Sequence, residues 1–270
     1  MLPTLVLVHG SGHTSLIWAE TVANLRGPAL AIDLPGRRRR PADLTRATIE
    51  ASSAAAASDV VAAASDRVIL VGHSSGGLIL PSLAARLGSR VCHLVFVAGL
   101  IAQDGHSVSE VIAPDDPDSM RTTADELRAR HAGTTFGGLT GGEMSIETDL
   151  RVTDDVRAVG SIESLTLMYQ PVSWSGVSPS IPRTFIRCLA DPIQPRDMQA
   201  RLIKCAGADE VVDIDADHTP AASRPGELAA ILNDVAGRYE LGAPSGPAES
   251  SEPAASAPAE PSWFSRPAGS

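Results

Sequence analysis

The strongest candidate for chemistry in this sequence is a serine between glycines, in the pentapeptide Gly72-His73-Ser74-Ser75-Gly76. The apolar run 68–71 before it predicts a buried strand, and the residues 76–87 after it predict a helix. A strand, a sharp turn and a helix in this order would expose the serine hydroxyl at the carboxyl edge of a sheet, with small neighbours that let other backbone approach closely. The pentapeptide alone occurs by chance, so the flanking elements carry the prediction that Ser74 is a nucleophile.

A nucleophilic serine needs a base that accepts its proton, and His218 is the candidate. It follows the last apolar run, 211–214, in a loop that leads toward the final predicted helix. Where this kind of serine turn occurs, the base comes after the serine and the acid in chain order. That order disfavours the other histidines, which lie before or inside the turn or precede the candidate acid: His9, His13, His73, His93, His106 and His131.

The acid that orients the base is expected to be Asp191, which follows the apolar run 184–188 at the carboxyl end of the penultimate strand. Asp104, just after the run 94–97, is the alternative, because the acid can also come from one strand earlier. Two further carboxyl residues lie too close in sequence to His218 to orient it across a site: Asp215 and Asp217.

Two backbone N–H groups would have to stabilise the negatively charged oxygen of a tetrahedral intermediate. We expect one from Ser75 and the other from Ser11, in the glycine-rich turn 9–13 after the first strand. Three residues of this turn are assigned to substrate binding: Gly10, Gly12 and His13. The turn lacks the third glycine and the acidic partner of a dinucleotide site, so we expect no nucleotide cofactor.

Short apolar runs alternate along the chain with longer amphipathic or alanine-rich stretches, which is typical of β-α-β units with strands buried on both faces of a parallel sheet. The expected strands are 4–8, 29–32, 68–71, 94–97, 184–188 and 211–214. The expected helices are 15–25, 44–64, 76–87, 197–205 and 225–239. We therefore predict an α/β fold with a doubly wound, mostly parallel sheet.

The alternation stops between residues 102 and 182, where glycines, acids and short helical patterns such as 123–130 replace the strand signal. An insertion of this length in a doubly wound sheet is typical of a lid, so we predict a small helical cap over 102–182. The core would then comprise 1–101 and 183–241. From 242 to 270 the chain is rich in Pro, Ala, Ser, Gly and Glu, which predicts a disordered tail.

Composition disfavours several classes of function. The 270 residues carry a formal net charge of -10, and the predicted cap holds 13 acids and 5 basic residues, which argues against nucleic acid and against polyanionic substrates. Neither a membrane span nor a secretory signal is recognisable, so we expect a cytoplasmic protein with no membrane partner. Cys92, Cys188 and Cys205 form no paired framework, and the first two lie in apolar runs, so we expect buried thiols and not disulfides. None has a partner at zinc-ligand spacing, so we expect no metal. The oligomeric state is left open.

Five ordered motifs between Leu5 and Tyr239 resemble the plant-type methylesterase and hydroxynitrile lyase branch of the α/β-hydrolases. They are Val8-His9-Gly10 followed by Trp18, Asp33-Leu34-Pro35-Gly36, Gly72 to Gly77, Cys188-Leu189-Ala190-Asp191 and Ala216-Asp217-His218. The resemblance implies the α/β-hydrolase fold and a metal-free Ser-Asp-His triad under a small helical cap, with small carboxylic esters as substrates. It also implies that Ser74, Asp191 and His218 fill the triad positions.

Two positions separate this chain from the hydroxynitrile lyases of that branch. Those lyases are similar to the esterases but carry Thr at the position of Gly10 and Lys at the position of Thr219. Without the lysine, the charge of a cyanide ion has no partner. The comparison therefore favours ester hydrolysis over cyanohydrin cleavage.

The run Arg37 to Arg40 is not part of that pattern. Its simplest interpretation is a solvated basic loop, although it is similar to the Pro-Gly-Arg segment of type II thioesterases.

The leading hypothesis is a serine hydrolase that cleaves a small ester through an acyl-enzyme on Ser74. A thioesterase or tailoring hydrolase of small-molecule biosynthesis comes second, because an acidic cap would repel an acidic carrier protein. A ligand-binding protein comes third, because the triad looks complete.

Overall fold

The computed structural model describes residues 1–37, 40–119, 121–135, 162, 163 and 165–240. It contains a six-stranded sheet with the strand order β2-β1-β3-β4-β5-β6, and each neighbouring pair is parallel. The strands are β1 (Thr4–Val8), β2 (Ala29–Ile32), β3 (Val68–His73), β4 (Val91–Val97), β5 (Arg183–Cys188) and β6 (Glu210–Ile214). The predicted fold class is confirmed, and the apolar runs locate all six strands.

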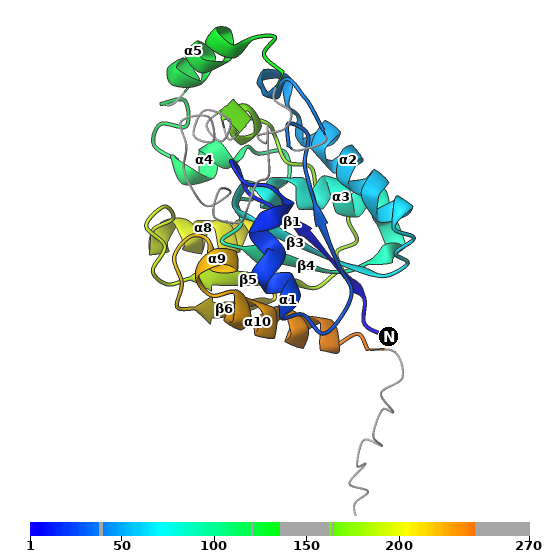
Figure 1. Ribbon diagram of the computed structural model, residues 1–270. Helices are drawn as coiled ribbons and strands as arrows, with labels where there is room; N and C mark the ends of the chain where they lie inside the picture. The colour runs from blue at the N-terminus through cyan, green and yellow to red at the C-terminus, as the bar shows by residue number, and fades with distance from the viewer. Residues whose placement is uncertain (38–39, 120, 136–161, 164, 241–270) are drawn as a thin grey trace, which may run out of the picture.

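Apolar side chains of successive strand residues point to opposite faces of the sheet, and both faces are largely buried along the central strands β1, β3, β4 and β5. In β1, Val6 and Val8 pack into one hydrophobic core, whereas Leu5 and Leu7 pack into the other. The first core lies under α2 (Ile49–Ala62), α3 (Leu80–Leu87) and α8 (Arg196–Ala206). The second includes apolar residues of α10 (Pro225–Gly237), which lies side by side with α1 (Ala19–Ala23) (Figure 1). Burial on both faces explains why the strands read as continuous apolar runs.

The remaining helices lie in the connections between these elements. They are η1 (Ser15–Trp18), η2 (Leu44–Arg46), η3 (Ser74–Ile79), η4 (Gly88–Arg90), α4 (Val108–Ile112), α5 (Arg121–His131) and α9 (Pro220–Ser223).

The helix predicted over 44–64 is broken, and this part of the prediction is wrong. Thr48 has an extended backbone, with φ -132° and ψ 149°, and its hydroxyl accepts the Ala51 N–H at 2.9 Å. Gln170 contacts the break from the predicted cap, because its Oε1 accepts the Ile49 N–H and its Nε2 donates to the Ala47 carbonyl. A threonine cap that starts α2 therefore interrupts the helix where a partner from a distant segment satisfies the freed backbone.

Strand order changes direction between β1 and β3. The chain runs outward from β1 to β2 on one side and from β3 to β4, β5 and β6 on the other, and a ligand site of an open α/β sheet is expected at such a point. Val8 at the end of β1 pairs with Gly72 in β3, which puts the turn after Val8 beside the turn that contains Ser74. Residues 76–79, predicted as the start of an α-helix, form the tighter 3₁₀ helix η3.

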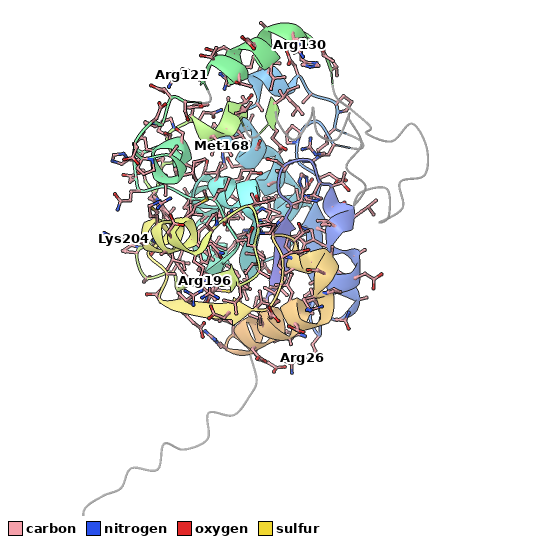
Figure 2. All side chains as sticks on the ribbon, turned by 90° about the vertical axis from the view of Figure 1, so that its left-hand side faces the viewer. Arg26, Arg121, Arg130, Met168, Arg196 and Lys204 are labelled. Carbon is pink, nitrogen blue, oxygen red and sulfur yellow. The ribbon has the colours of Figure 1, made fainter. Side chains whose placement is uncertain are left out.

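The described residues between β4 and β5 lie at the end of the molecule opposite the start of β1, with α5 outermost (Figure 1). Met168 packs against the first core and lies between α5, marked by Arg121 and Arg130, and α8, marked by Lys204 (Figure 2). The indole N–H of Trp174 donates to the Ala102 carbonyl at 3.0 Å, so the hydrogen bond joins the beginning of the predicted cap to a residue near its end. Residues 120, 136–161 and 164 of the predicted cap and the predicted tail 242–270 lie outside the described residues.

Among the residues that the structure describes, no helix has the length and apolar character to cross a bilayer. Cys92, Cys188 and Cys205 are free thiols. The cytoplasmic location stays a prediction.

Replacing Gly76 by Ala should destabilise the fold at the crossing of β1 and η3. A Cβ at this position would lie 2.7 Å from the His9 carbonyl oxygen and 2.8 Å from that of Val8, and backbone cannot move aside as a flexible side chain does. We expect a loss of about 1–3 kcal/mol in the free energy of unfolding, measured by urea titration.

Gly226→Ala is the matched control, because a Cβ there meets nothing within 4 Å and the residue lies in the first turn of α10. It should change stability by less than about 1 kcal/mol, in the stabilising direction. Equal effects of the two substitutions would contradict the proposed crowding at Gly76.

Candidate active site

Ser74 sits at a strained turn directly after β3. Its φ of +49° is unusual for a residue with a Cβ and costs about 1–3 kcal/mol. The turn is held by the Leu100 N–H, which donates to the Ser74 carbonyl at 2.8 Å, and by close packing of Gly72 against the backbone of Gly76. The strain is offset by this packing, and Ser74 remains partly accessible at the carboxyl edge of the sheet.

His218 and Asp191 meet Ser74 from the loops after β6 and β5. The His218 Nε2 lies 3.0 Å from the Ser74 Oγ, and its Nδ1 lies 2.7 Å from the Asp191 Oδ2. The Asp191 side chain is fully buried, and that of His218 is 11% exposed. The three residues expected to form a triad are therefore brought together in the order acid, base and hydroxyl.

This chain of contacts fixes the direction of the protons. An ionised carboxylate only accepts, so His218 Nδ1 carries the hydrogen and Nε2 is left to accept the hydroxyl proton of Ser74. Burial would raise the pKa of Asp191, but the hydrogen bond and charge of His218 and the N–H groups of Gln194 and Ile193 outweigh it and lower the pKa. The arrangement is that of a general base beside a nucleophile.

Two glutamines that the sequence did not single out stabilise the loop that carries Asp191. The N–H groups of Ile193 and Gln194 donate to the Asp191 Oδ1 at 2.8 and 2.9 Å. The Gln194 side chain donates to the Ala98 carbonyl, and Gln199 bonds both the N–H and the carbonyl of Cys188. Gln199 lies on α8, so only the folded structure reveals that it faces the end of β5.

The Asp104 alternative does not reach the site. Its carboxylate accepts the backbone N–H of Trp174 at 2.8 Å on the exposed side of the predicted cap. Asp217 accepts the Thr219 N–H and the Ser223 hydroxyl instead of a histidine proton. Among the candidate acids, Asp191 alone contacts His218 through its side chain in the hydrogen bonds of the described residues.

His73, inside the serine turn, positions the base. Its Nε2 lies 2.8 Å from the His218 carbonyl oxygen, so Nε2 carries the hydrogen. Burial, with His218 and His13 nearby, lowers the pKa of His73 well below its usual value. Chain order excluded His73 as the base, but nothing in the sequence indicated that it would hold the base's backbone.

The turn 9–13 after β1 lies against Ser74. A Cβ on Gly10 would come within 2.9 Å of the Ser74 Cβ, and the Ser11 hydroxyl donates to the Ser75 hydroxyl at 2.7 Å. Gly12 has a φ of +76°, which favours glycine. The two residues predicted to supply the oxyanion N–H groups, Ser11 and Ser75, are thus in contact beside the serine, and His13 lies in the same turn.

The interpretation of Arg37 to Arg40 as a solvated loop is wrong for Arg37, whose side chain is fully buried. Its guanidinium pairs with Glu163 of the predicted cap, and its Nε donates to the His13 carbonyl at 2.6 Å. Arg40 pairs with Asp59 on α2. Arg38 and Arg39 lie outside the described residues.

Comparison with known protein families and proteins identifies relatives of this chain. A model described as "Alpha/beta hydrolase family" matches residues 5–231. This chain belongs to the α/β-hydrolase family. It is 26% identical to Methylesterase 3 of Arabidopsis thaliana over 87% of this chain and 96% of that protein, and 27% identical to Esterase PIR7B of Oryza sativa subsp. japonica with the same coverage. These relatives confirm the resemblance to plant methylesterases.

Among solved structures, the chain is similar to an extracellular α/β-hydrolase from a Paenibacillus species. The TM-score is 0.67 at 18% identity, over 87% of this chain and 99% of that one. At this identity, the likeness concerns the fold of the α/β-hydrolase.

Buried neutral histidines predict that the protein loses stability in mild acid. Burial lowers the pKa of His13 and His93 to about 4 and that of His9 and His73 well below the usual value. Between about pH 6.5 and 4 the unfolded chain binds protons that the folded chain refuses, so the free energy of unfolding should fall with pH by up to about 1.4 kcal/mol per unit for each histidine.

Urea titrations at pH 8, 7, 6 and 5 would measure this slope. His93→Gln should lower the slope of unfolding free energy against pH near pH 5 by the amount that one proton contributes. His93 suits this test because it lies between Tyr239 and Thr184, away from the active site. Above pH 8 these histidines are neutral in both states and contribute no slope. Equal stability at pH 7 and pH 5 would contradict the prediction.

Proposed function

We propose that this chain is a serine hydrolase that cleaves a small carboxylic ester through an acyl-enzyme on Ser74. The observation that carries the proposal is the continuous hydrogen-bonded chain from Asp191 through His218 to the Ser74 hydroxyl. In this family and this geometry, the serine is the nucleophile and the histidine is the general base.

The reaction would proceed in two halves. As the Ser74 Oγ attacks the ester carbonyl, its proton passes to His218 Nε2 and Asp191 stabilises the imidazolium. The tetrahedral intermediate collapses when the C–O bond to the alcohol breaks and His218 returns the proton to the leaving oxygen. Water, deprotonated by His218, then attacks the acyl-enzyme, and the acid leaves as Ser74 regains its proton.

Backbone N–H groups of Ser11 and Ser75 would stabilise the charged oxygen in both halves. Their contact through the two hydroxyls, at 2.7 Å, supports this role. Gly10 supports it too, because the absence of a side chain there lets the turn approach Ser74. Gly12 and His13 complete the proposed lining of the substrate site.

Small esters are the proposed substrate class. The plant relatives are named as methylesterase and esterase, and the acidic balance of residues 102–182 disfavours polyanionic substrates. We propose that this segment forms a lid over the site. Nothing in the described residues favours a thioesterase, because Arg37 and Arg40, which suggested one, are engaged by Glu163 and Asp59.

Ser74→Ala should abolish turnover of short p-nitrophenyl esters and labelling by a fluorophosphonate probe, while the melting temperature stays close to that of the wild type. The expected loss in kcat is about 10⁴-fold or more, because no other group can form the acyl-enzyme. A Ser74→Ala protein with wild-type turnover would sink the proposal, as would a wild-type protein with neither labelling nor turnover.

Asp191→Asn and Asp104→Asn form a matched pair that tests the acid. Asn at 191 would favour the wrong histidine tautomer and should lower kcat by about 10³- to 10⁴-fold. Asn at 104 keeps an oxygen that accepts the Trp174 N–H, so kcat should stay within about twofold of the wild type. The reverse pattern would assign the acid to Asp104.

A further inference from the structure

The turn that carries Ser11 is hydrogen-bonded to a buried ion pair whose two residues come from distant segments of the chain. Arg37 comes from the loop after β2, and Glu163 comes from the insertion between β4 and β5. Arg37 Nε donates to the carbonyl of His13, and the carboxylate of Glu163 accepts the backbone N–H of Gly12. The two side chains bond each other, and each bonds one of two successive residues of the turn. Together with the turn, they form a closed ring of hydrogen bonds.

Both charged side chains are almost completely inaccessible, with exposed fractions of 0% for Arg37 and 3% for Glu163. A buried ion pair of this kind contributes little net stability compared with apolar residues of the same size, because both charges lose their hydration. Its hydrogen bonds, in contrast, fix geometry. Arg37 uses its planar group in three directions, toward His13, Glu163 and the Gly36 carbonyl, which a lysine could not reproduce.

The bonded atoms lie next to the proposed oxyanion donor. Gly12 N–H belongs to the peptide unit that follows Ser11, so its hydrogen bond to Glu163 sets the orientation of the backbone there. Ser11 is also tied to Ser75 through the hydroxyls. Gly12 itself has a positive φ and no side chain, so it contributes no side-chain contact that would hold this peptide unit.

We propose that Arg37 and Glu163 are positioning residues for the oxyanion hole, and that the cap segment sets the geometry of the hole through Glu163. Neither residue touches the reacting atoms. The inference rests on the proposed function, because it concerns the N–H group of Ser11 in the ester reaction. Displacing such a donor by about 1 Å is enough to lower a rate by about 100-fold.

The test removes both charges together, in the variant Arg37→Met with Glu163→Leu, so that no unpaired charge is left buried. We expect kcat on a p-nitrophenyl ester to fall by about 10- to 100-fold, with KM within about twofold of the wild type. A trifluoromethyl ketone, which forms a tetrahedral adduct with the serine, should bind more weakly by a similar factor. The corresponding methyl ketone, which resembles the ground state, should bind as before.

The matched control is Arg40→Met with Asp59→Leu. It removes an ion pair from the same basic run, but neither side chain bonds the turn in the described residues. Here kcat and inhibitor affinity should stay at wild-type values, even if the melting temperature falls.

Arg37→Lys covers the case in which the double variant does not fold. Lysine keeps the charge opposite Glu163 but cannot bond His13 and Glu163 with the same planar geometry, so kcat should fall at least threefold in a folded protein. Wild-type kcat and inhibitor affinity in folded Arg37→Lys, or in the folded double variant, would overturn the proposal and leave the pair a purely structural role. Ser74→Ala distinguishes failure of this proposal from failure of the proposed function. If only the positioning role is wrong, Ser74→Ala is inactive; if the proposed function is wrong, Ser74→Ala is active.

Discussion

The close approach of backbone where β1 and β3 end is the constraint on which the active site depends. Glycines at 72 and 76 let η3 begin within van der Waals distance of the end of β1, where a Cβ would overlap carbonyl oxygens. This contact holds Ser74 at a positive φ, a conformation that a free chain would leave. The strain is local, but the support is not, since it comes from the pairing of Val8 with Gly72 in the centre of the sheet.

The other functional groups are held by backbone polar atoms that loops leave unpaired. Loops after parallel strands have N–H and carbonyl groups with no ladder partner, and buried ones must be satisfied. Here Asp191 accepts two such N–H groups, His73 donates to the carbonyl of His218, and Arg37 donates to that of His13. The same bonds that satisfy the loops therefore orient the acid, the base and the turn beside the serine.

Much of the fold could be predicted because the central strands are largely buried on both faces, so that each of them is a short apolar run in the sequence. The grouping of Ser74, Asp191 and His218 could be predicted for a related reason, since all three follow such runs and the carboxyl ends of parallel strands share one edge. Arg37 could not be placed correctly. Its partner Glu163 is 126 residues away, and a run of arginines reads as solvated unless that partner is known. The role of Gln199 could not be predicted, because its contact with Cys188 depends on which face of α8 packs against the end of β5. The break before α2 could have been predicted, because threonine is a preferred N-cap residue and Thr48 directly precedes the helix.

Charge balance around the serine favours the imidazolium that forms during the reaction. His9, His13 and His73 lie close to one another in and beside the turn, and burial lowers the pKa of each, so they stay neutral near pH 7. If any were protonated, it would oppose the proton that His218 must accept, as two like charges in a site of low dielectric repel strongly. Glu163 offsets the charge of Arg37 in the same way. Asp191 then acts on His218 without competition from these neighbours, which is the electrostatic condition for a carboxylate to stabilise a transient positive charge.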